Sequence, residues 1–342
     1  MSGSEVLVFI FLFIIQIIVT ETNEVYGLTI RMPNVVPQKP DSLLCHAVKL
    51  DPIESYILKF EPLASKSVAH HMNLFGCDEP GSDLPSWTCG EENEEGHRLP
   101  ICKHGPPRIL YAWALDGKPR SLPSGTGYRV GGTTGINYLL INLHYKDKLS
   151  PGQTDNSGYY LEMTHDKQPL QVGHYILGTI GEIPPMTKEF HADSGCNYDS
   201  KETIYPIAYR THSHNLGVVT SGYRYRDGTY TEIGRMSPQL PQTFYDVAEP
   251  NMNITTGDLL ISRCTMSSQR KFPTNIGPTN KDEMCNFYIM YYTSRQEDIK
   301  DERMCFRDHN SFHLKDYITT LPPNISSIVG LPKFERTDPY AV

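Results

Sequence analysis

Several short stretches of the chain alternate apolar and polar residues with a period of two, which predicts β-strands with one buried face. The clearest are Ser55–Phe60, Ile136–Tyr145, Tyr159–Met163, Tyr205–His214 and Asp258–Cys264. Asp227-Gly228 separates two further runs, SGYRYR and TYTEIGR, and indicates a tight hairpin. No stretch keeps a helical period for three turns. We therefore predict an all-β chain built from two antiparallel, jelly-roll-like β-sandwich domains.

The first apolar run differs from the others because it does not alternate. Val6–Thr20 is apolar except for Gln16 and Thr20, and acidic residues follow it at once. This length suits a secretory signal better than a spanning helix, which needs about 20 apolar residues. We expect residues 1–21 to be a cleaved signal peptide, with an uncleaved membrane anchor as the alternative, because no Lys or Arg precedes the run. The sequons at Asn253 and Asn324 agree with secretion.

The length of 342 residues predicts two domains. The polar, proline-containing segment 166–171 is typical of a short linker. We place the domains at 22–168 and 169–312, followed by a C-terminal tail at 313–342. A formal charge of −8 argues against a nucleic-acid partner. The 26 glycines, 26 prolines and 10% aromatic residues favour a turn-rich β protein.

Eight cysteines in an exported chain indicate a disulfide framework. They form two blocks of four: Cys45, Cys77, Cys89 and Cys102 in the first, and Cys196, Cys264, Cys285 and Cys305 in the second. This separation predicts that each domain is cross-linked by its own disulfides. Spacing alone leaves three pairings open in each block. A zinc knuckle is excluded because the chain has no C-x-x-C motif.

Histidines provide the candidate chemistry. His212 and His214 are two residues apart in a predicted strand, so both rings should point to one face and could bind one ion. Met284 is a candidate third ligand, because two imidazoles and a thioether are soft enough for copper in its Cu(I) state. His70, His71 and His144 could form a second site that suits copper or zinc. Adjacent histidines diverge on a regular strand, so this second site implies a bend or bulge.

Simpler interpretations exist for each of these residues. A single histidine in a strand is more often exposed or hydrogen-bonded than a metal ligand, and methionines in strands are mostly core residues. This default applies to the remaining histidines: His46, His97, His104, His165, His174, His191, His309 and His313.

A candidate anion site accompanies the His-x-His pair. Arg210 precedes His212 by two residues, so its guanidinium could hold a carboxylate beside the metal. Asn286 and Tyr288 follow Met284 at the same alternating spacing. In the alternative interpretation, Arg210 pairs with a nearby Asp or Glu and Tyr288 is a core residue. No G-x-S-x-G, P-loop or dinucleotide-binding motif offers a competing chemistry.

Several longer strings resemble the peptidylglycine α-hydroxylating monooxygenases, a group within the copper type II ascorbate-dependent monooxygenase family. The similarity extends from about Leu28 to Cys305. It is carried by HHMNLFGC (70–77), ILYAWA (109–114), YRVGGTTG (128–135), LHY (143–145), YRTHSHNLG (209–217), VVTSGYR (218–224), IGRMSPQLPQTFY (233–245) and DEMCNFYIMYY (282–292).

The resemblance implies a specific division of roles. His70, His71 and His144 would hold a copper that stores and transfers electrons. His212, His214 and Met284 would hold a second copper, where O₂ and substrate react. Arg210, Asn286 and Tyr288 would bind the C-terminal carboxylate of a glycine-extended peptide, with ascorbate as the reductant and Tyr288 also counted in the catalytic set. The implied disulfides are Cys45–Cys89, Cys77–Cys102, Cys196–Cys305 and Cys264–Cys285.

Some features depart from the family pattern. Leu43 stands where the family has tyrosine, and Asn142 where it has glutamine, so any role of these positions in electron transfer is in doubt. Only 37 residues follow Cys305, too few for the lyase of bifunctional relatives. The expected function is therefore hydroxylation alone, in the secretory pathway, with a separate lyase acting downstream. The alternatives are a catecholamine hydroxylase and a non-enzymatic, secreted copper-binding protein.

Overall fold

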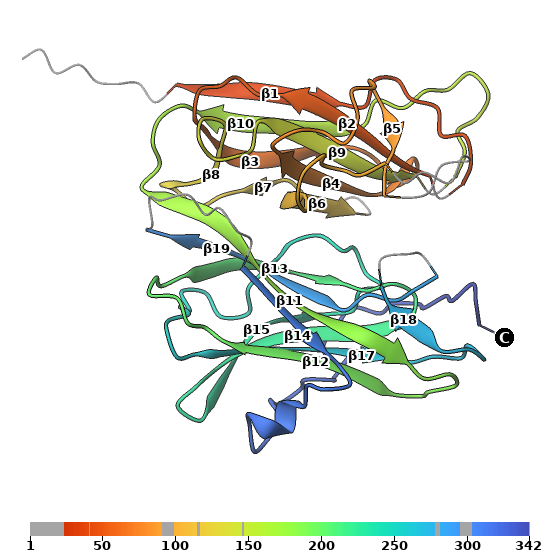
Figure 1. Cartoon of the computed structure of the whole chain (residues 1–342), viewed down its shortest axis with the longest axis vertical. Helices are drawn as coiled ribbons and strands as arrows, with labels where there is room; N and C mark the ends of the chain where they lie inside the picture. The colour runs from red at the N-terminus through yellow and green to blue at the C-terminus, as the bar shows by residue number, and fades with distance from the viewer. Residues whose placement is uncertain are drawn as a thin grey trace, which may run out of the picture.

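The protein is described by a computed structural model in which residues 24–40, 42–90, 99–114, 117–145, 147–277, 281–294 and 303–341 can be placed. The expected signal peptide and His97 lie outside these residues. Strands dominate the fold, and the helical element Leu314–Asp316 is a single 3₁₀ turn. The predicted all-β fold is confirmed. Figure 1 shows two lobes, with β1 to β10 in the upper one and β11 to β20 in the lower one.

The upper lobe is a sandwich of two sheets. One face follows the strand order β1-β10-β3-β8, with β7 beside β3, and the other follows β5-β2-β9-β4-β6. The strand bounds are β1 Val25–Arg31, β2 Leu43–Lys49, β3 Ser55–Leu63, β4 Ala69–Cys77, β5 Trp87–Thr88, β6 Arg108–Ala114, β7 Arg120–Ser121, β8 Thr126–Val130, β9 Tyr138–Tyr145 and β10 Gly158–Thr164.

The lower lobe repeats this plan with other strands. One side is the continuation of the sheet β1-β10-β3-β8, which runs on through the pairing of β8 with β11 in the order β11-β19-β13-β16, with β18 and β20 also paired to β11, and makes one 11-stranded sheet. The facing sheet is β12-β17-β14-β15. The strand bounds are β11 Leu170–Ile183, β12 Phe190–Asn197, β13 Tyr205–His212, β14 Gly217–Arg226, β15 Thr229–Met236, β16 Tyr245–Asp246, β17 Leu259–Met266, β18 Thr274–Ile276, β19 Asn286–Thr293 and β20 Arg303–Asp308.

The alternating stretches match strands closely, with one informative exception. The predicted strand Tyr205–His214 ends at His212, so His214 lies in the loop that follows β13. The Asp227-Gly228 hairpin joins β14 to β15, and both turn residues have positive φ (49° and 81°), as a two-residue turn of this type requires. Two pairs depart from the antiparallel expectation, because β11 runs parallel to both β8 and β20.

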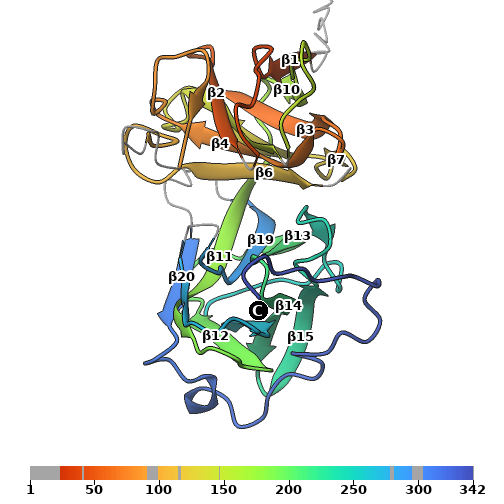
Figure 2. The ribbon, with the colours of Figure 1, turned by 90° about the vertical axis from the view of Figure 1, so that its right-hand side faces the viewer.

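The junction between the lobes is packed and apolar. Strand β11 enters the lower lobe directly after pairing with β8 of the upper lobe at Leu170 and Gln171. One core cluster includes residues of both lobes, and the ring of Phe244 stacks 5.8 Å from that of Tyr111. The Thr243 hydroxyl donates a hydrogen bond to the Ala112 carbonyl at 3.3 Å. Figure 2 shows β6 on the side of the upper lobe that faces the lower one. The two lobes therefore contact each other through packed side chains as well as through the pairing of β8 with β11.

Four disulfides staple the lobes, two in each. They join Cys45 to Cys89, Cys77 to Cys102, Cys196 to Cys305 and Cys264 to Cys285. These are the pairs that the resemblance implied, and none crosses between the two blocks. Among the described residues no helix is long and apolar enough to cross a membrane.

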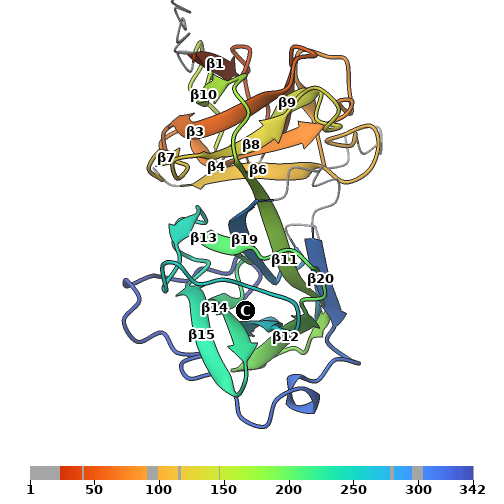
Figure 3. The same cartoon turned by 90° about the vertical axis from the view of Figure 1, so that its left-hand side faces the viewer.

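The chain after β20 wraps around the lower lobe. Figures 2 and 3 show it passing the 3₁₀ turn at Leu314, running beside β15 and returning toward β14. Its apolar side chains Phe312, Leu314, Ile318 and Ile325 pack with Tyr223 and Ile261 in a common core cluster. The predicted tail is thus a packed part of the lobe in this structure.

Candidate metal centres

The first histidine group comes together where β4 begins and β9 ends. Ligand atoms of His70, His71 and His144 all lie within 4.8 Å of one another. His71 is paired directly with His144 across the two strands, and the register shifts between Ala69 and His71. This shift is the bulge that the adjacent histidines implied, and it turns both imidazoles toward His144. The Nδ1 atoms of His70 and His71 are 3.3 Å apart.

Burial keeps His71 in the neutral form that binds a metal. Burial lowers the pKa of His71 well below its usual value, and the charges of His144, His70, His212 and Arg210 lower it further. A neutral imidazole has the lone pair that binds a metal.

The second group lies where β13 ends and β19 begins. His212 is the last residue of β13, and its Nε2 atom is 3.0 Å from the Met284 sulfur. The rings of His212 and His214 are 5.5 Å apart between centroids. Met284 precedes β19 by two residues and is not itself in a strand, contrary to the sequence interpretation. The three predicted ligands of the second copper site are nevertheless brought together.

Hydrogen bonds orient both imidazoles of the second group. His212 Nδ1 donates to the side-chain oxygen of Gln242, and His214 Nδ1 donates to the Asp282 carbonyl at 3.0 Å. Because both Nδ1 protons are used in this way, both Nε2 lone pairs remain available for a metal. Burial lowers the pKa of His212 well below its usual value, and nearby Arg210 adds to this shift. The donor set fits a copper ion.

Two residues of this centre were missed by sequence analysis. The Gln242 amide also donates to the carbonyls of Ser213 and Pro238, at 2.9 and 2.8 Å, so it holds the His212–His214 loop in place. Glu283 is fully buried and accepts backbone N–H groups from His214, Leu216 and Met284. The only signal for Glu283 was its place before Met284, and Gln242 is 30 residues from His212 in the chain.

A Glu283→Gln variant tests this positioning role. One carboxylate oxygen that accepts backbone N–H groups would be replaced by an NH₂ group, which cannot accept them. We expect the affinity of the second site for copper to fall about 10- to 100-fold, the range found when an outer-shell partner is lost. Titration with a Cu(I) chelator measures this, and unchanged affinity would contradict the role of Glu283.

Arg210, Asn286 and Tyr288 lie on the sheet face that carries His212. The strand register pairs Arg210 with Tyr288 and His212 with Asn286. The guanidinium of Arg210 lies 4.9 Å from the centre of the Tyr288 ring, and the Asn286 amide is 3.8 Å from the Met284 sulfur. On the neighbouring strand, Gly178 lets the Phe306 ring pack beside Asn286, since a Cβ there would lie 2.4 Å from that ring and 2.8 Å from Asn286 Oδ1.

Arg210 is a buried cation with an unusual environment. It is 4% exposed, and its Nε donates to the Gln242 carbonyl at 2.7 Å. Within the described residues it forms no ion pair with a carboxylate, which excludes there the alternative that it pairs with a nearby Asp or Glu. Burial lowers its pKa. A buried charge with no carboxylate partner among the described residues is costly, so this arrangement favours an anionic ligand.

Comparison with family models accounts for both lobes. Residues 28–150 match the N-terminal domain of copper type II ascorbate-dependent monooxygenases, and residues 170–318 match their C-terminal domain. The chain belongs to this family. Dependence on copper and ascorbate follows from that membership, and the two histidine groups lie one in each matched domain.

Individual relatives refine the placement within the copper type II ascorbate-dependent monooxygenases. The chain is 42% identical to the peptidylglycine alpha-amidating monooxygenase of Rattus norvegicus and to that of type B of Xenopus laevis, over 78% of its length. It is 26% identical to dopamine beta-hydroxylase of Canis lupus familiaris over 83% of its length. The aligned part is 27%, 30% and 48% of these three relatives, respectively.

The two departures from the family pattern lie close to the first centre. Leu43 on β2 is paired with His144. Asn142 is buried, and its amide donates to the Cys89 sulfur at 3.2 Å. It also accepts a hydrogen bond from Asn73 at 3.4 Å. Asn142 therefore ties the strand that bears His144 to the Cys45–Cys89 disulfide.

His174 is neither exposed nor hydrogen-bonded within the described residues, contrary to what was expected of a single histidine in a strand. It is 2% exposed on β11, between the rings of Tyr128 and Phe244, with centroids at 5.7 and 5.4 Å. Neither ring nitrogen has a hydrogen-bond partner among the described residues. Burial, with a smaller effect from Arg210, lowers its pKa to about 3. Sequence could not reveal this, because the two covering rings come from distant parts of the chain, Tyr128 from the upper lobe and Phe244 from the lower one.

A His174→Leu variant should change how stability depends on pH. The unfolded chain binds a proton at this residue below about pH 6.5, whereas the folded chain does so only near pH 3. Stability from His174 is therefore lost as pH falls through this window, by up to about 1.4 kcal/mol per pH unit. Denaturant unfolding of the copper-free protein at pH 7.5, 5.5 and 4.5 should show a smaller decline in the variant. Identical declines would contradict this.

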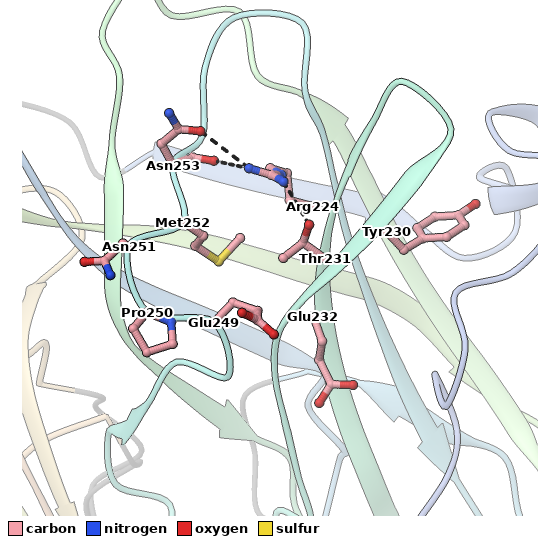
Figure 4. A pocket seen from close by; sticks show the side chains of 9 residues that line it. All are labelled: Arg224, Tyr230, Thr231, Glu232, Glu249, Pro250, Asn251, Met252 and Asn253. Atoms are coloured by element: carbon pink, nitrogen blue, oxygen red, sulfur yellow. Dashed lines mark hydrogen bonds between the residues drawn. The ribbon is translucent and has the colours of Figure 1, made fainter.

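One surface hollow lies away from both centres. It has a volume of about 530 Å³ and is lined by nine residues of the lower lobe, none of them a candidate ligand. Figure 4 shows Arg224 donating to Asn253 at its rim. The hollow therefore does not compete with the histidine groups as an active site.

Proposed function

We propose that this chain hydroxylates the α-carbon of a C-terminal glycine in peptides, using O₂, ascorbate and two copper ions. The observation that carries the proposal is the buried cation of Arg210, which forms no ion pair with a carboxylate in the described part of the chain and lies on the same sheet face as His212. Support comes from the 42% identity to a protein named peptidylglycine alpha-amidating monooxygenase. In the reaction, a C–H bond becomes C–OH, the second oxygen atom leaves as water, and two ascorbate molecules supply two electrons and two protons.

The proposed roles follow from the geometry. Bound copper would supply one-electron redox chemistry, with His70, His71 and His144 holding one ion and His212, His214 and Met284 the other. Arg210 would bind the peptide carboxylate by a charge-assisted hydrogen bond, supported by Asn286 and Tyr288. Fixing the carboxylate would place the adjacent glycine α-carbon beside the second site. Glycine would suit this approach because no side chain blocks its α-carbon.

The alternative of a catecholamine hydroxylase is less compatible with Arg210. A catecholamine carries a cationic ammonium group, and a buried guanidinium on the same face would repel it. A non-enzymatic copper protein would bind the metal yet show no oxygen uptake. These three functions therefore predict different results with a small set of substrates.

The test is oxygen consumption by the copper-loaded protein with ascorbate and a short peptide that ends in glycine. We expect uptake and a product heavier by one oxygen atom at the terminal glycine. The same peptide with a C-terminal amide serves as the matched control and should react poorly. Uptake with tyramine alone would favour the catecholamine reaction, and no uptake with any substrate at two coppers per chain would favour binding alone.

The product's fate and the chain's location are part of the proposal. Peptidyl-α-hydroxyglycine should persist at neutral pH until a separate lyase acts, and the same mass spectra would show glyoxylate release if lyase activity were present. We place the enzyme in the secretory pathway or outside the cell, and residues 1–21 would anchor it to the membrane if they stayed attached.

Of the two sequons, Asn324 is the better placed for a glycan. Its side chain is exposed in a turn with φ of 61°. Asn253 is half-buried, and its Oδ1 atom lies 3.5 Å from the Arg224 guanidinium. We therefore propose that the secreted protein is glycosylated at Asn324. Glycosidase treatment should shift the mobility of the wild-type protein and leave Asn324→Gln unshifted, with Asn253→Gln as the comparison.

A further inference from the structure

The last residues described form an extended segment against the lower lobe. Exposure alternates along Lys333–Ala341, so that Phe334, Arg336, Asp338 and Tyr340 are half-buried while the residues between them are exposed. This alternation shows that one side of the segment packs on the protein. Of its two charged, inward-facing residues, Arg336 contacts the loop that carries His214, and Asp338 contacts Arg270, which in turn contacts the loop that carries Met284.

Arg336 reaches the loop after His214. Its guanidinium donates to the Leu216 carbonyl at 2.9 Å and also to the Ser267 carbonyl. The Leu216 N–H in turn donates to Glu283 at 2.6 Å. The same Glu283 carboxylate accepts the backbone N–H groups of His214 and Met284. Glu283 therefore binds the N–H group of Leu216, and Arg336 binds the carbonyl group of the same residue.

Asp338 reaches the loop before Met284 through a second arginine. Its carboxylate accepts two hydrogen bonds from Arg270, both at 2.9 Å, in a bidentate pair. Arg270 is fully buried, and its remaining nitrogen donates to the Lys281 carbonyl at 2.6 Å. The Tyr340 ring covers the same guanidinium at 4.8 Å. Lys281 is three residues before Met284.

We propose that Arg336 and Asp338 are positioning residues for the second copper site. Together they hold the His214 loop and the Met284 loop at a fixed separation, one by direct contact and the other through Arg270. Such a constraint matters most for the thioether, because methionine is flexible and a weak ligand that must be held close to the ion. The inference rests on the proposed assignment of copper to His212, His214 and Met284.

The experiment measures each copper site separately in the full chain. A His144→Ala background leaves the second site to be titrated with a Cu(I) chelator, and a His212→Ala background leaves the first. In the His144→Ala background, we expect Arg336→Met and Asp338→Asn each to weaken copper binding at the second site about 10-fold or more. In the His212→Ala background, we expect neither change to affect copper binding at the first site. Glu335→Gln, an exposed neighbour in the same segment, is the matched control and should have no effect.

A spectroscopic signature separates positioning from simple stabilisation. X-ray absorption of the Cu(I)-loaded His144→Ala protein should show sulfur scattering from Met284, and Arg336→Met should reduce it. A lower melting temperature with unchanged copper affinity and unchanged sulfur scattering would overturn the inference. Equal weakening of both sites would also overturn it, because that is the result of general unfolding.

The same data distinguish failure of the inference from failure of the assignment. If His212→Ala retained both copper ions, the second site would lie elsewhere, and the inference would fall together with the assignment. If His212→Ala lost one ion while Arg336→Met and Asp338→Asn lost none, the assignment would stand and the inference alone would fall.

Discussion

Met284→Ala is expected to lose nearly all hydroxylation of a glycine-terminated peptide while the protein remains folded. Loss of an outer-shell partner costs about 10- to 100-fold, so loss of the ligand itself should exceed about 100-fold in kcat. Met284 is half-buried and lies outside the core clusters, so the melting temperature should change little. The measurement is kcat together with copper content.

The matched control for this variant is Met304→Ala. The Met304 side chain is 48% exposed and belongs to no candidate ligand set, so its removal should leave turnover and copper content unchanged. Turnover in Met284→Ala at the level of Met304→Ala would remove the thioether from the mechanism.

Arg210→Ala should mainly raise the KM of peptides that end in a free carboxylate. A charge-assisted hydrogen bond contributes about 1.5–3 kcal/mol, so losing it should raise KM about 10- to 100-fold. A peptide with a C-terminal amide should show similar kinetics in the variant and the wild type. An equal KM for the acid peptide in both proteins would refute the carboxylate contact.

Two further readouts separate binding from folding in this variant. Arg210→Lys keeps the charge but lacks the planar fork, so it should recover part of the lost affinity. Removing a buried and unpaired charge should not destabilise the substrate-free protein, although it leaves the Gln242 carbonyl without its donor. A variant that failed to fold would instead show that Arg210 is structural.

Period-two alternation and the Asp227-Gly228 hairpin signal predicted seven of the twenty strands in the described residues, because alternation directly reflects a sheet with one buried face; these strands are β3, β9, β10, β13, β14, β15 and β17. Alternation could not predict that β13 ends at His212, since the pattern continues through His214. That end coincides with a long-range contact, the capture of the His214 and Leu216 N–H groups by Glu283. The parallel pairing of β11 with β20 was hidden for the same reason.

The candidate ligands could be predicted from the sequence because His, Met and Arg have distinctive chemistry and occur at spacings that place their side chains on one face of a predicted strand. Gln242 could not, because a glutamine gives no such signal and its partner His212 is distant in the chain. His174 was expected to be exposed or hydrogen-bonded, and only the packing of Phe244 and Tyr128 against it shows otherwise. Residues that orient a site or lie at a junction depend on tertiary contacts that a single sequence does not contain.

The pairing of β11 with β20 has a consequence for how the protein is made. All strands of the upper lobe are complete by Thr164, so this lobe can fold while the ribosome is still translating the rest. The lower lobe cannot, since Arg303–Asp308 must pair with Tyr175–Ile180, which emerged much earlier. Until then β11 lacks its β20 partner, and an unpaired strand edge is a template for aggregation. Nascent chains stalled before β20 should therefore be the species most dependent on chaperones.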